Sequence, residues 1–329
     1  MPAVLAVVLA IGQEGFCWWL ALLAVLGVMS AHLGMNVADD YFDYKVDMLG
    51  SRDKVVRQGF RAMTSKYPYL VDGSRTLADT MRAILLFGAV ALLLGAVIVV
   101  CRLTIPSLHP TLGFWPLIVV VATTMLLGIF YSAPPLKLGY RGLGEPVIGL
   151  IFGPLLMMGV YYAAAGTLQP DVAMVSVPVG LLVLNILFTH SIIDKKGDEA
   201  SNKMTLARLI DSDRGNLAAS LVINMLPFVM IVVAVCCHIM HPLYLVTLLV
   251  LPRAIWLYRS LVSFSRGEDD QHQEQLQNPP RWLGQLTQWE SIRQAGLCWF
   301  MARWLTARNL LSGFCTLIAL VRIALLIFL

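Results

Sequence analysis

Charged side chains are scarce in this sequence. Asp, Glu, Lys and Arg make up 13% of its 329 residues, about half their share in an ordinary soluble domain. The mean hydropathy is +0.74, and apolar stretches of about twenty residues recur, each long enough to cross the hydrocarbon layer of a bilayer. This composition excludes a water-soluble enzyme and indicates an integral membrane protein. Because the apolar runs are continuous rather than alternating, we expect the spans to be helices.

The apolar runs predict nine candidate spans in a single membrane domain over residues 1–329. They lie roughly at 2–12, 16–38, 77–101, 111–131, 145–166, 171–193, 215–238, 241–261 and 305–328. The first is too short to cross a bilayer, and no basic residue precedes it. A signal peptide is therefore disfavoured, and it stays open whether the chain begins upstream.

Every second loop is nearly free of basic residues, with Arg102 as the exception. The other loops carry clusters of Lys and Arg, which mark the cytoplasmic side of a membrane protein. We therefore expect the N-terminus inside and the C-terminus outside. The net charge of +4 reflects this bias and does not indicate nucleic acid binding.

The six cysteines show no metal-binding or redox spacing. Cys236 and Cys237 are adjacent and cannot form an ordinary disulfide. We expect the cysteines to serve as apolar packing residues.

Acidic residues gather where two predicted spans end, on the same side as the basic loops. The first group follows Asn36 and contains Asp39, Asp40, Asp43 and Asp47; the second contains Asp194, Asp198 and Glu199. Asn36, Asp40, Asp43 and Asp47 fall within about 60° on a helix, and Asp194 and Asp198 also share a face. Like charges at this spacing destabilise a helix, so we predict a function for them rather than simple solvation.

Stacked carboxylates suit hard divalent cations, and Mg²⁺ is usually held by a few carboxylates together with substrate phosphates. Arg57 and Arg61 follow the first group and Lys203 follows the second. These cations suit phosphate oxygens. In an apolar helical bundle, the metal site and the cations point to a prenyl diphosphate as the ligand, with its tail between the helices.

Three segments carry a resemblance to a known family. They are DDYFDYKVD, then YSAPPLKLGYRGLGEPVIGLIFGPLL from Tyr131, then DKKGDEASNKMTLA from Asp194. In this order they resemble the UbiA-type intramembrane prenyltransferase superfamily. The resemblance implies an all-α membrane protein with nine transmembrane helices around a central cavity, capped by cytoplasmic loops. It also implies Mg²⁺ bound by two Asp motifs that hold a polyprenyl diphosphate.

By position, the resemblance assigns the metal-binding and catalytic roles to Asp40, Asp43, Asp47, Asp194 and Asp198. It places Asn36 at a polar position of the family, whereas Asp39 stands where Asn is more usual. We predict further substrate contacts for Asp39, Tyr131, Lys137 and Tyr140. An apolar chamber would shield the allylic cation from water. The faces of Tyr41, Tyr44, Tyr131 and Tyr140 could stabilise it, although tyrosines also anchor proteins at membrane interfaces.

The acceptor is predicted to be an aromatic quinone precursor. YSAPPLKLGYRGLGE and NKMTLA look most like the branch that prenylates 1,4-dihydroxy-2-naphthoate for menaquinone. The DDxxDxxxD spacing instead resembles enzymes that prenylate 4-hydroxybenzoate, and His190 and Ser191 replace an Asn pair. Other acceptors of the superfamily stay open, and so does the assignment of the loop FRAMTSKYPYLVDG.

Two further residues and one segment keep alternative roles. His190 precedes Asp194 by one turn and suits either substrate contact or packing in the bundle. Glu145 suits helix capping or substrate contact. Trp282, Leu286, Trp289 and Ile292 recur at helical spacing, which predicts an interfacial amphipathic helix over 281–300.

An ion-coupled transporter is the rival class. Transport sites usually lie near the bilayer midplane on broken helices, whereas these acids lie at the cytoplasmic edge. We therefore expect an enzyme in the plasma membrane of a bacterium or archaeon, with its active site facing the cytoplasm and lipid around its spans.

Overall fold

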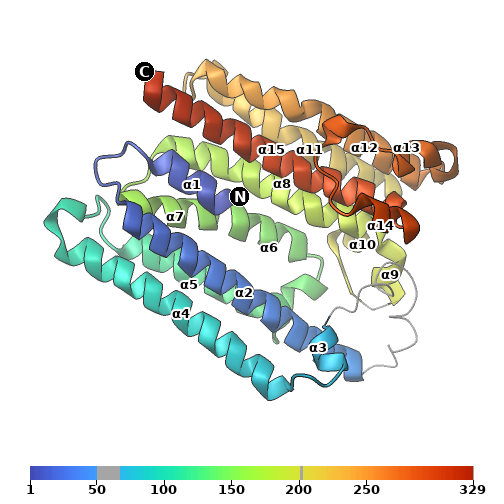
Figure 1. The fold of residues 1–329 in the computed structure, drawn as a ribbon, viewed down its shortest axis with the longest axis horizontal. Coiled ribbons are helices and arrows are strands. Elements are labelled where there is room, and N and C mark those ends of the chain that lie inside the picture. The colour runs from blue at the N-terminus through green and yellow to red at the C-terminus, as the bar shows by residue number, and fades with distance from the viewer. Residues whose placement is uncertain (50–66, 201–202, 329) are drawn as a thin grey trace.

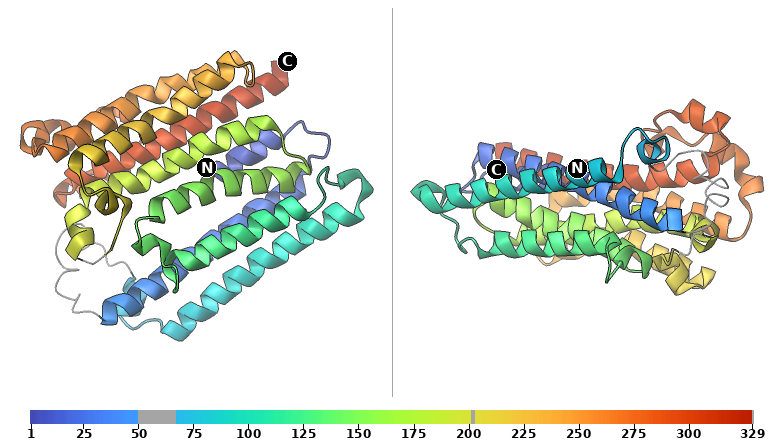
Figure 2. Two further views of the ribbon diagram at one scale, coloured as in Figure 1. Left: turned by 180° about the vertical axis from the view of Figure 1, so that it is seen from behind. Right: turned by 90° about the horizontal axis from the view of Figure 1, so that it is seen from below.

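The computed structural model describes residues 1–49, 67–200 and 203–328. Long helices run side by side through the molecule, with α4 at one edge and α12 at the opposite edge (Figure 1). Viewed from below, the bundle is a flattened slab (Figure 2). Within the described residues, regular structure is helical apart from an isolated bridge between Arg141 and Met204. The prediction of an all-α membrane fold is confirmed.

Eight helical segments are long and apolar enough to cross a membrane in the described part of the chain. Their edges fall within about four residues of the predicted spans, with two exceptions: α2 continues to Leu49, well past the predicted end at residue 38, and the last helix begins at Cys298 instead of residue 305. The segments are α2 (Trp18–Leu49), α4 (Leu77–Thr104), α5 (Trp115–Ser132), α6 to α7 (Gly144–Ala165), α8 (Pro170–Ile193), α11 (Asp213–Cys236), η6 with α12 (Pro242–Ser265) and α15 (Cys298–Phe328). The first predicted span is the short helix α1 (Pro2–Ala10).

Local sequence signals explain several of the helix ends. Thr76 and Asp79 form a reciprocal capping box at the start of α4, and the side chain of Ser212 accepts the N–H of Gly215 at the start of α11. Helix α7 ends at Gly166, whose φ of 71° is left-handed and therefore suits glycine.

The span from Gly144 to Ala165 is not uniform. It consists of α6 (Gly144–Leu150), the π-helical stretch η5 (Ile151–Leu155), which contains Pro154, and α7 (Leu156–Ala165). Such widened turns often occur at functional sites. This span and α8 lie in the middle of the bundle, where α8 also packs against α11 and α15.

Arg102, the exception in the charge pattern, is a buried structural residue with 3% of its surface exposed. Its guanidinium donates to the carbonyl oxygens of Gly15, Leu108 and Ala163 at 3.0–3.3 Å. It therefore ties together the loop at Gly15, the short turn η3 (Pro106–Leu108) and the end of α7 at one end of the bundle. Arg102 is explained by these bonds and does not act as a topological charge.

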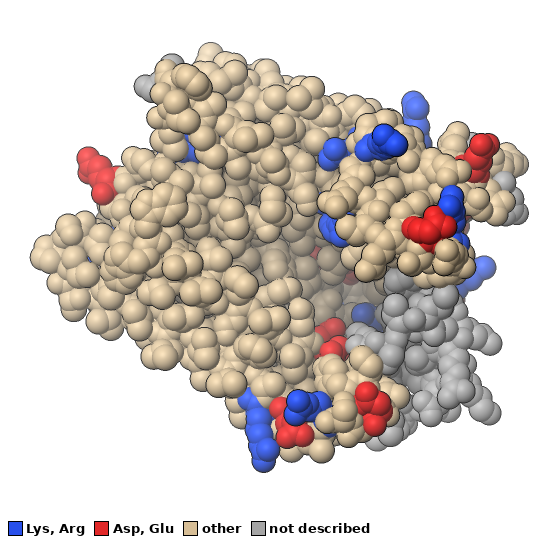
Figure 3. Space-filling view, in the orientation of Figure 1, with Lys and Arg blue, Asp and Glu red and all other residues tan. Residues whose placement is uncertain are grey.

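Most charged side chains on the face shown in Figure 3 gather at the other end, around the end of α2 and the segment between α12 and α15. The face is hollowed between these two regions, and acidic atoms are visible in the hollow. The two predicted Asp motifs lie at this end, on α2 and at the junction of α8 with α9 (Lys195–Ala200).

Candidate active site

Hydroxyl groups from three other elements bind the carboxylates of the first acidic group on α2, namely Asp39, Asp40 and Asp43. Ser132 at the end of α5 donates to Asp39 at 2.7 Å. Tyr69 on α3 (Pro68–Val71) donates to Asp40 at 2.7 Å. Tyr140, on the short turn η4 (Leu138–Tyr140), donates to Asp43, which is 7% exposed. Hydrogen bonds to ionised groups are strong, so these donors offset the repulsion between neighbouring carboxylates.

Tyr69 lies in the loop that the sequence left unassigned. Partial burial and the adjacent carboxylate of Asp40 raise the pKa of its phenol. The hydroxyl therefore keeps its proton at neutral pH and remains a donor to Asp40. Neither Tyr69 nor Ser132 was predicted as a site residue. The aspartate that each one binds lies far away in the sequence, and no local pattern links the two residues of either pair.

The second motif begins where α8 ends. The N–H of Asp194 bonds to the carbonyl of His190, and the N–H of Asp198 bonds to the carbonyl of Asp194, each at 2.9 Å. Asp198 is 1% exposed. A Cβ atom on Gly197 would lie 2.4 Å from Oδ1 of Asp194. The glycine in DKKGD therefore leaves the space that the Asp194 carboxylate occupies.

Two tyrosines lie between the motifs. Tyr140 binds Asp43 through its hydroxyl, and the ammonium of Lys203 lies 5.9 Å from the centroid of its ring. Tyr131 lies within electrostatic reach of both Asp39 and Asp198. The structure thus brings together groups that lie about 150 residues apart in the sequence.

Glu145 holds the second motif's loop in place. It is 4% exposed, accepts the hydroxyl of Ser191 at 2.5 Å, and accepts the N–H of Leu206 at 3.1 and 3.2 Å. Leu206 is the first residue of α10 (Leu206–Ile210). Of the two roles considered for Glu145, the structure shows capping, but of α10 rather than of its own helix. Ser191, which departs from the resembled pattern, completes this contact.

The remaining predicted residues are placed as follows. His190 packs edge to face on Phe300, with ring centroids 5.2 Å apart. Lys137 has a left-handed backbone, with φ of 45°, in the loop before Tyr140. Nδ2 of Asn36 lies 3.4 Å from Nε2 of His32. Arg57 and Arg61 lie outside the described residues, and so does the side chain of Asp47.

The carboxylates suit a metal that is shared with a phosphate ligand. Within the described residues, no three His, Cys, Asp or Glu side chains converge to hold a metal ion by themselves. Mg²⁺ commonly takes only one or two protein carboxylates and completes its shell with phosphate oxygens and water. Asp40 with Asp43, and Asp194 with Asp198, are oxygen-donor pairs of that kind, so the residues present fit Mg²⁺ in this mode.

The segment between α12 and α15 differs from the expected helix over 281–300. It contains η8 (Arg281–Leu283) and α14 (Trp289–Gln294), and α15 begins at Cys298. Gly284, Gln288 and Gly296 have φ of 104°, 56° and 69°. These left-handed residues interrupt the helix that the spacing of the apolar residues predicted.

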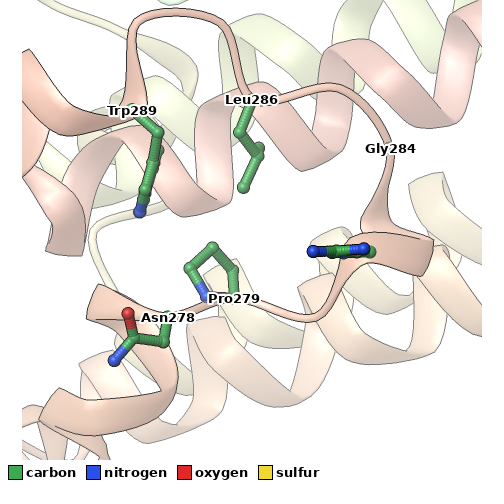
Figure 4. Close-up of a pocket in the computed structure, with 6 residues that line it drawn as sticks. Asn278, Pro279, Gly284, Leu286 and Trp289 are labelled. Atoms are coloured by element: carbon green, nitrogen blue, oxygen red, sulfur yellow. The ribbon is translucent and has the colours of Figure 1, made fainter.

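A surface pocket of about 350 Å³ lies within this segment, lined by Asn278, Pro279, Arg281, Gly284, Leu286 and Trp289. In Figure 4, Trp289 and Leu286 point across it toward Pro279. The indole of Trp289 donates to the carbonyl of Gln277 at 2.8 Å. None of the predicted site residues lines this pocket, so it is separate from the Asp motifs.

Comparison with known proteins gives a family match. The profile of the UbiA prenyltransferase family matches residues 1–278. The chain is 28% identical to a 1,4-dihydroxy-2-naphthoate octaprenyltransferase of Mycobacterium leprae over 63% of each chain. It is 27% identical to a 2-carboxy-1,4-naphthoquinone phytyltransferase of Synechocystis over 50% of this chain and 52% of that protein. Each alignment thus covers less than two thirds of the relative's own length.

The fold is also found in a solved structure. A UbiA homolog from Archaeoglobus fulgidus, bound to DMAPP and Mg²⁺, matches over 94% of each chain with a TM-score of 0.53 and 13% identity. At this identity the match shows a shared fold.

Proposed function

The chain belongs to the UbiA prenyltransferase family, and on that premise we propose that it transfers a polyprenyl group from its diphosphate to an aromatic quinone precursor. The acceptor we propose is 1,4-dihydroxy-2-naphthoate. The observation that carries this proposal is the link between the two Asp motifs at one end of the bundle: Tyr140 binds Asp43, the ammonium of Lys203 lies 5.9 Å from the centroid of the Tyr140 ring, and the N–H of Lys203 bonds to the carbonyl of Asp198. The names of the similar naphthoate prenyltransferases support the choice of acceptor.

In the proposed reaction, Asp40 and Asp43 of the first motif and Asp194 and Asp198 of the second would hold Mg²⁺ together with the diphosphate. Mg²⁺, when bound, stabilises the charge that develops on the departing diphosphate. Lys203 places a further positive charge next to Tyr140. Asp47, Arg57 and Arg61 are assigned to the same diphosphate end.

The allylic carbon–oxygen bond breaks with its electron pair on the diphosphate. An electron-rich carbon of the acceptor ring then bonds to the allylic carbon, and that ring carbon releases the group it carried, either a proton or its carboxylate as CO₂, which restores the aromatic ring. The tyrosine rings near the Asp motifs are placed to stabilise the cation. Tyr131, which is half-buried and within electrostatic reach of Asp39 and Asp198, is our first candidate. The apolar bundle excludes water, which would otherwise capture the cation. We propose that this site faces the cytoplasm of a bacterial or archaeal cell.

The proposal is tested in membranes with labelled geranylgeranyl diphosphate, Mg²⁺ and one acceptor at a time. We expect prenylated product with 1,4-dihydroxy-2-naphthoate, and none after addition of EDTA. Product only with 4-hydroxybenzoate would correct the acceptor, and no product with any aromatic acceptor would reject the proposal.

We expect Asp40→Ala and Asp194→Ala to lower turnover by at least 100-fold, because each removes a carboxylate from one side of the site. The matched control is Glu14→Ala, which removes an exposed carboxylate from a loop at the opposite end. All three variants should elute from a size-exclusion column like the parent protein. Full activity in both aspartate variants would refute the metal-site assignment.

A further inference from the structure

His32 extends the polar face of α2, which Asn36, Asp40 and Asp43 form, deeper into the bundle. It precedes Asn36 by four residues, and at 100° per residue His32, Asn36, Asp40 and Asp43 share an arc of about 80°. Eight residues separate His32 from Asp40, which places it about 12 Å further along the helix axis. His32 therefore lies within an apolar span, beyond direct reach of a diphosphate bound at the carboxylates.

The other faces of α2 show which way His32 points. Ser30 donates to the carbonyl of Phe87 on α4 at 2.9 Å, and the side chain of Met35 lies over Gly128 on α5. These contacts cover the sides of α2 that face α4 and α5. The ring of His32 instead packs edge to face on Phe152, in the π-helical stretch, with centroids 5.2 Å apart.

His32 is also accessible. Its side chain is exposed, although its ring packs edge to face with Phe152. Other polar side chains of the inner spans are closed off: Asn185 and Asn224 are fully buried and hydrogen-bonded to each other at 2.9 Å. Of these groups, His32 is the one that can offer a hydrogen bond to a molecule inside the bundle. Polar side chains within a span usually mark a functional path.

The contact with Asn36 favours one tautomer of His32. The amide Nδ2 of Asn36 can only donate, and it lies 3.4 Å from Nε2 of His32. Nε2 is therefore the acceptor, and the proton of the neutral ring is on Nδ1. That N–H is available to an oxygen anion of a ligand.

We infer that His32 is a positioning residue for the aromatic acceptor, whose carboxylate or phenolate oxygen receives the Nδ1–H. This inference rests on the proposed function and assigns one step of it. The acceptor must lie on the apolar side of the breaking carbon–oxygen bond, and it carries polar oxygens that need a partner there. Asn36, held by His32, marks the boundary between the diphosphate and the acceptor.

The test uses the purified full chain and the variants His32→Leu and His32→Gln. Leucine removes the donor, whereas glutamine keeps an N–H. We expect His32→Leu to raise the KM for 1,4-dihydroxy-2-naphthoate at least tenfold. The KM of His32→Gln should lie between the values of His32→Leu and the parent protein. The affinity of both variants for farnesyl thiolodiphosphate, an unreactive donor analogue, measured in the presence of Mg²⁺, should stay within twofold of the parent value. His109→Leu, in a loop at the opposite end of the bundle, is the matched control.

A second measurement separates this inference from the proposed function. Binding of 1-hydroxy-2-naphthoate, a stable acceptor analogue, is followed by quenching of tryptophan fluorescence. Absence of turnover in the parent protein would reject the proposed function. Even then, naphthoate binding that is weaker in His32→Leu than in the parent and in His109→Leu would support the acceptor site. Equal naphthoate binding in parent and variant would overturn the inference, and so would a parallel loss of donor affinity.

Discussion

Gly197 shows how one residue without a side chain shapes the candidate site. A Cβ atom there would lie 2.4 Å from Oδ1 of Asp194. This contact is too short, so the carboxylate of Asp194 would have to move. We predict that Gly197→Ala lowers kcat/KM for the diphosphate at least tenfold. Alanine favours helix by about 1 kcal/mol over glycine, so the substitution should not destabilise α9 itself.

The measurement is steady-state kinetics together with thermal unfolding. Gly88→Ala in α4 is the matched control, because a Cβ atom on Gly88 meets nothing within 4 Å. An active Gly197→Ala variant with an unchanged KM for the diphosphate would contradict the assignment of Asp194 to diphosphate binding.

Glu145 gives a second prediction, about stability as well as activity. Glu145→Ala leaves the N–H of Leu206 and the hydroxyl of Ser191 without their acceptor. An unsatisfied buried group costs about 1–3 kcal/mol, and the loop that carries Lys203 loses its anchor. We expect a lower Tm and lower activity, with Ser191→Ala having the smaller effect because Leu206 keeps its bond. A larger loss of Tm in Ser191→Ala would contradict this account.

The residues that could be predicted from the sequence are those whose partners lie on the same helix. The spacing of Asn36, Asp40 and Asp43 is a local pattern, and a helix converts it directly into a shared face. Tyr69 and Ser132 bind the same stripe from other helices, and no local pattern encodes a contact across 29 or 93 positions. His32 could have been found as a polar residue one turn before Asn36.

At the scale of the element, the spans were predicted well because an apolar run of about twenty residues has few other stable forms in a membrane. The segment after α12 was predicted wrongly as a continuous helix. The helical spacing of Trp282, Leu286 and Trp289 did not account for the left-handed backbone at Gly284 and Gln288. Arg303 explains part of that segment's path. It is 1% exposed and bonds Asp269 through two nitrogens at 2.6 and 2.9 Å, which ties the segment to α15.

The contact between η5 and α8 gives the prediction at this scale. A Cβ atom on Gly153 would lie 2.4 Å from Cα of Gly180 and 2.6 Å from the carbonyl oxygen of Ser176. Both obstacles are backbone atoms, so the helices must separate. We predict that Gly153→Ala destabilises the protein by about 1–3 kcal/mol, the usual cost of overpacking.

The readout is thermal unfolding in detergent, with Gly95→Ala as the control, because a Cβ atom on Gly95 meets nothing within 4 Å. An unchanged Tm in Gly153→Ala would mean that this close approach of η5 to α8 does not contribute to stability.

At the scale of the whole molecule, the two ends differ in charge. The end with the Asp motifs carries most of the charged side chains on the face shown in Figure 3. At the opposite end, Arg102 is buried and hydrogen-bonded to backbone carbonyl oxygens inside the structure. This separation supports the proposed orientation, in which the basic loops stay in the cytoplasm.

The cysteines provide a direct test of that orientation. The expectation that the cysteines serve as packing residues is wrong for Cys236 and Cys237, which are exposed where α11 ends, opposite the Asp motifs. We predict that a membrane-impermeant maleimide labels them in intact cells, and that Cys236→Ser with Cys237→Ser removes most of the signal. In that background, Lys196→Cys on the exposed surface of α9 should react only after the membrane is permeabilised, because α9 lies at the other end. The reverse pattern would place the candidate active site outside the cell, where the prenyl diphosphate and naphthoate made in the cytoplasm could not reach it.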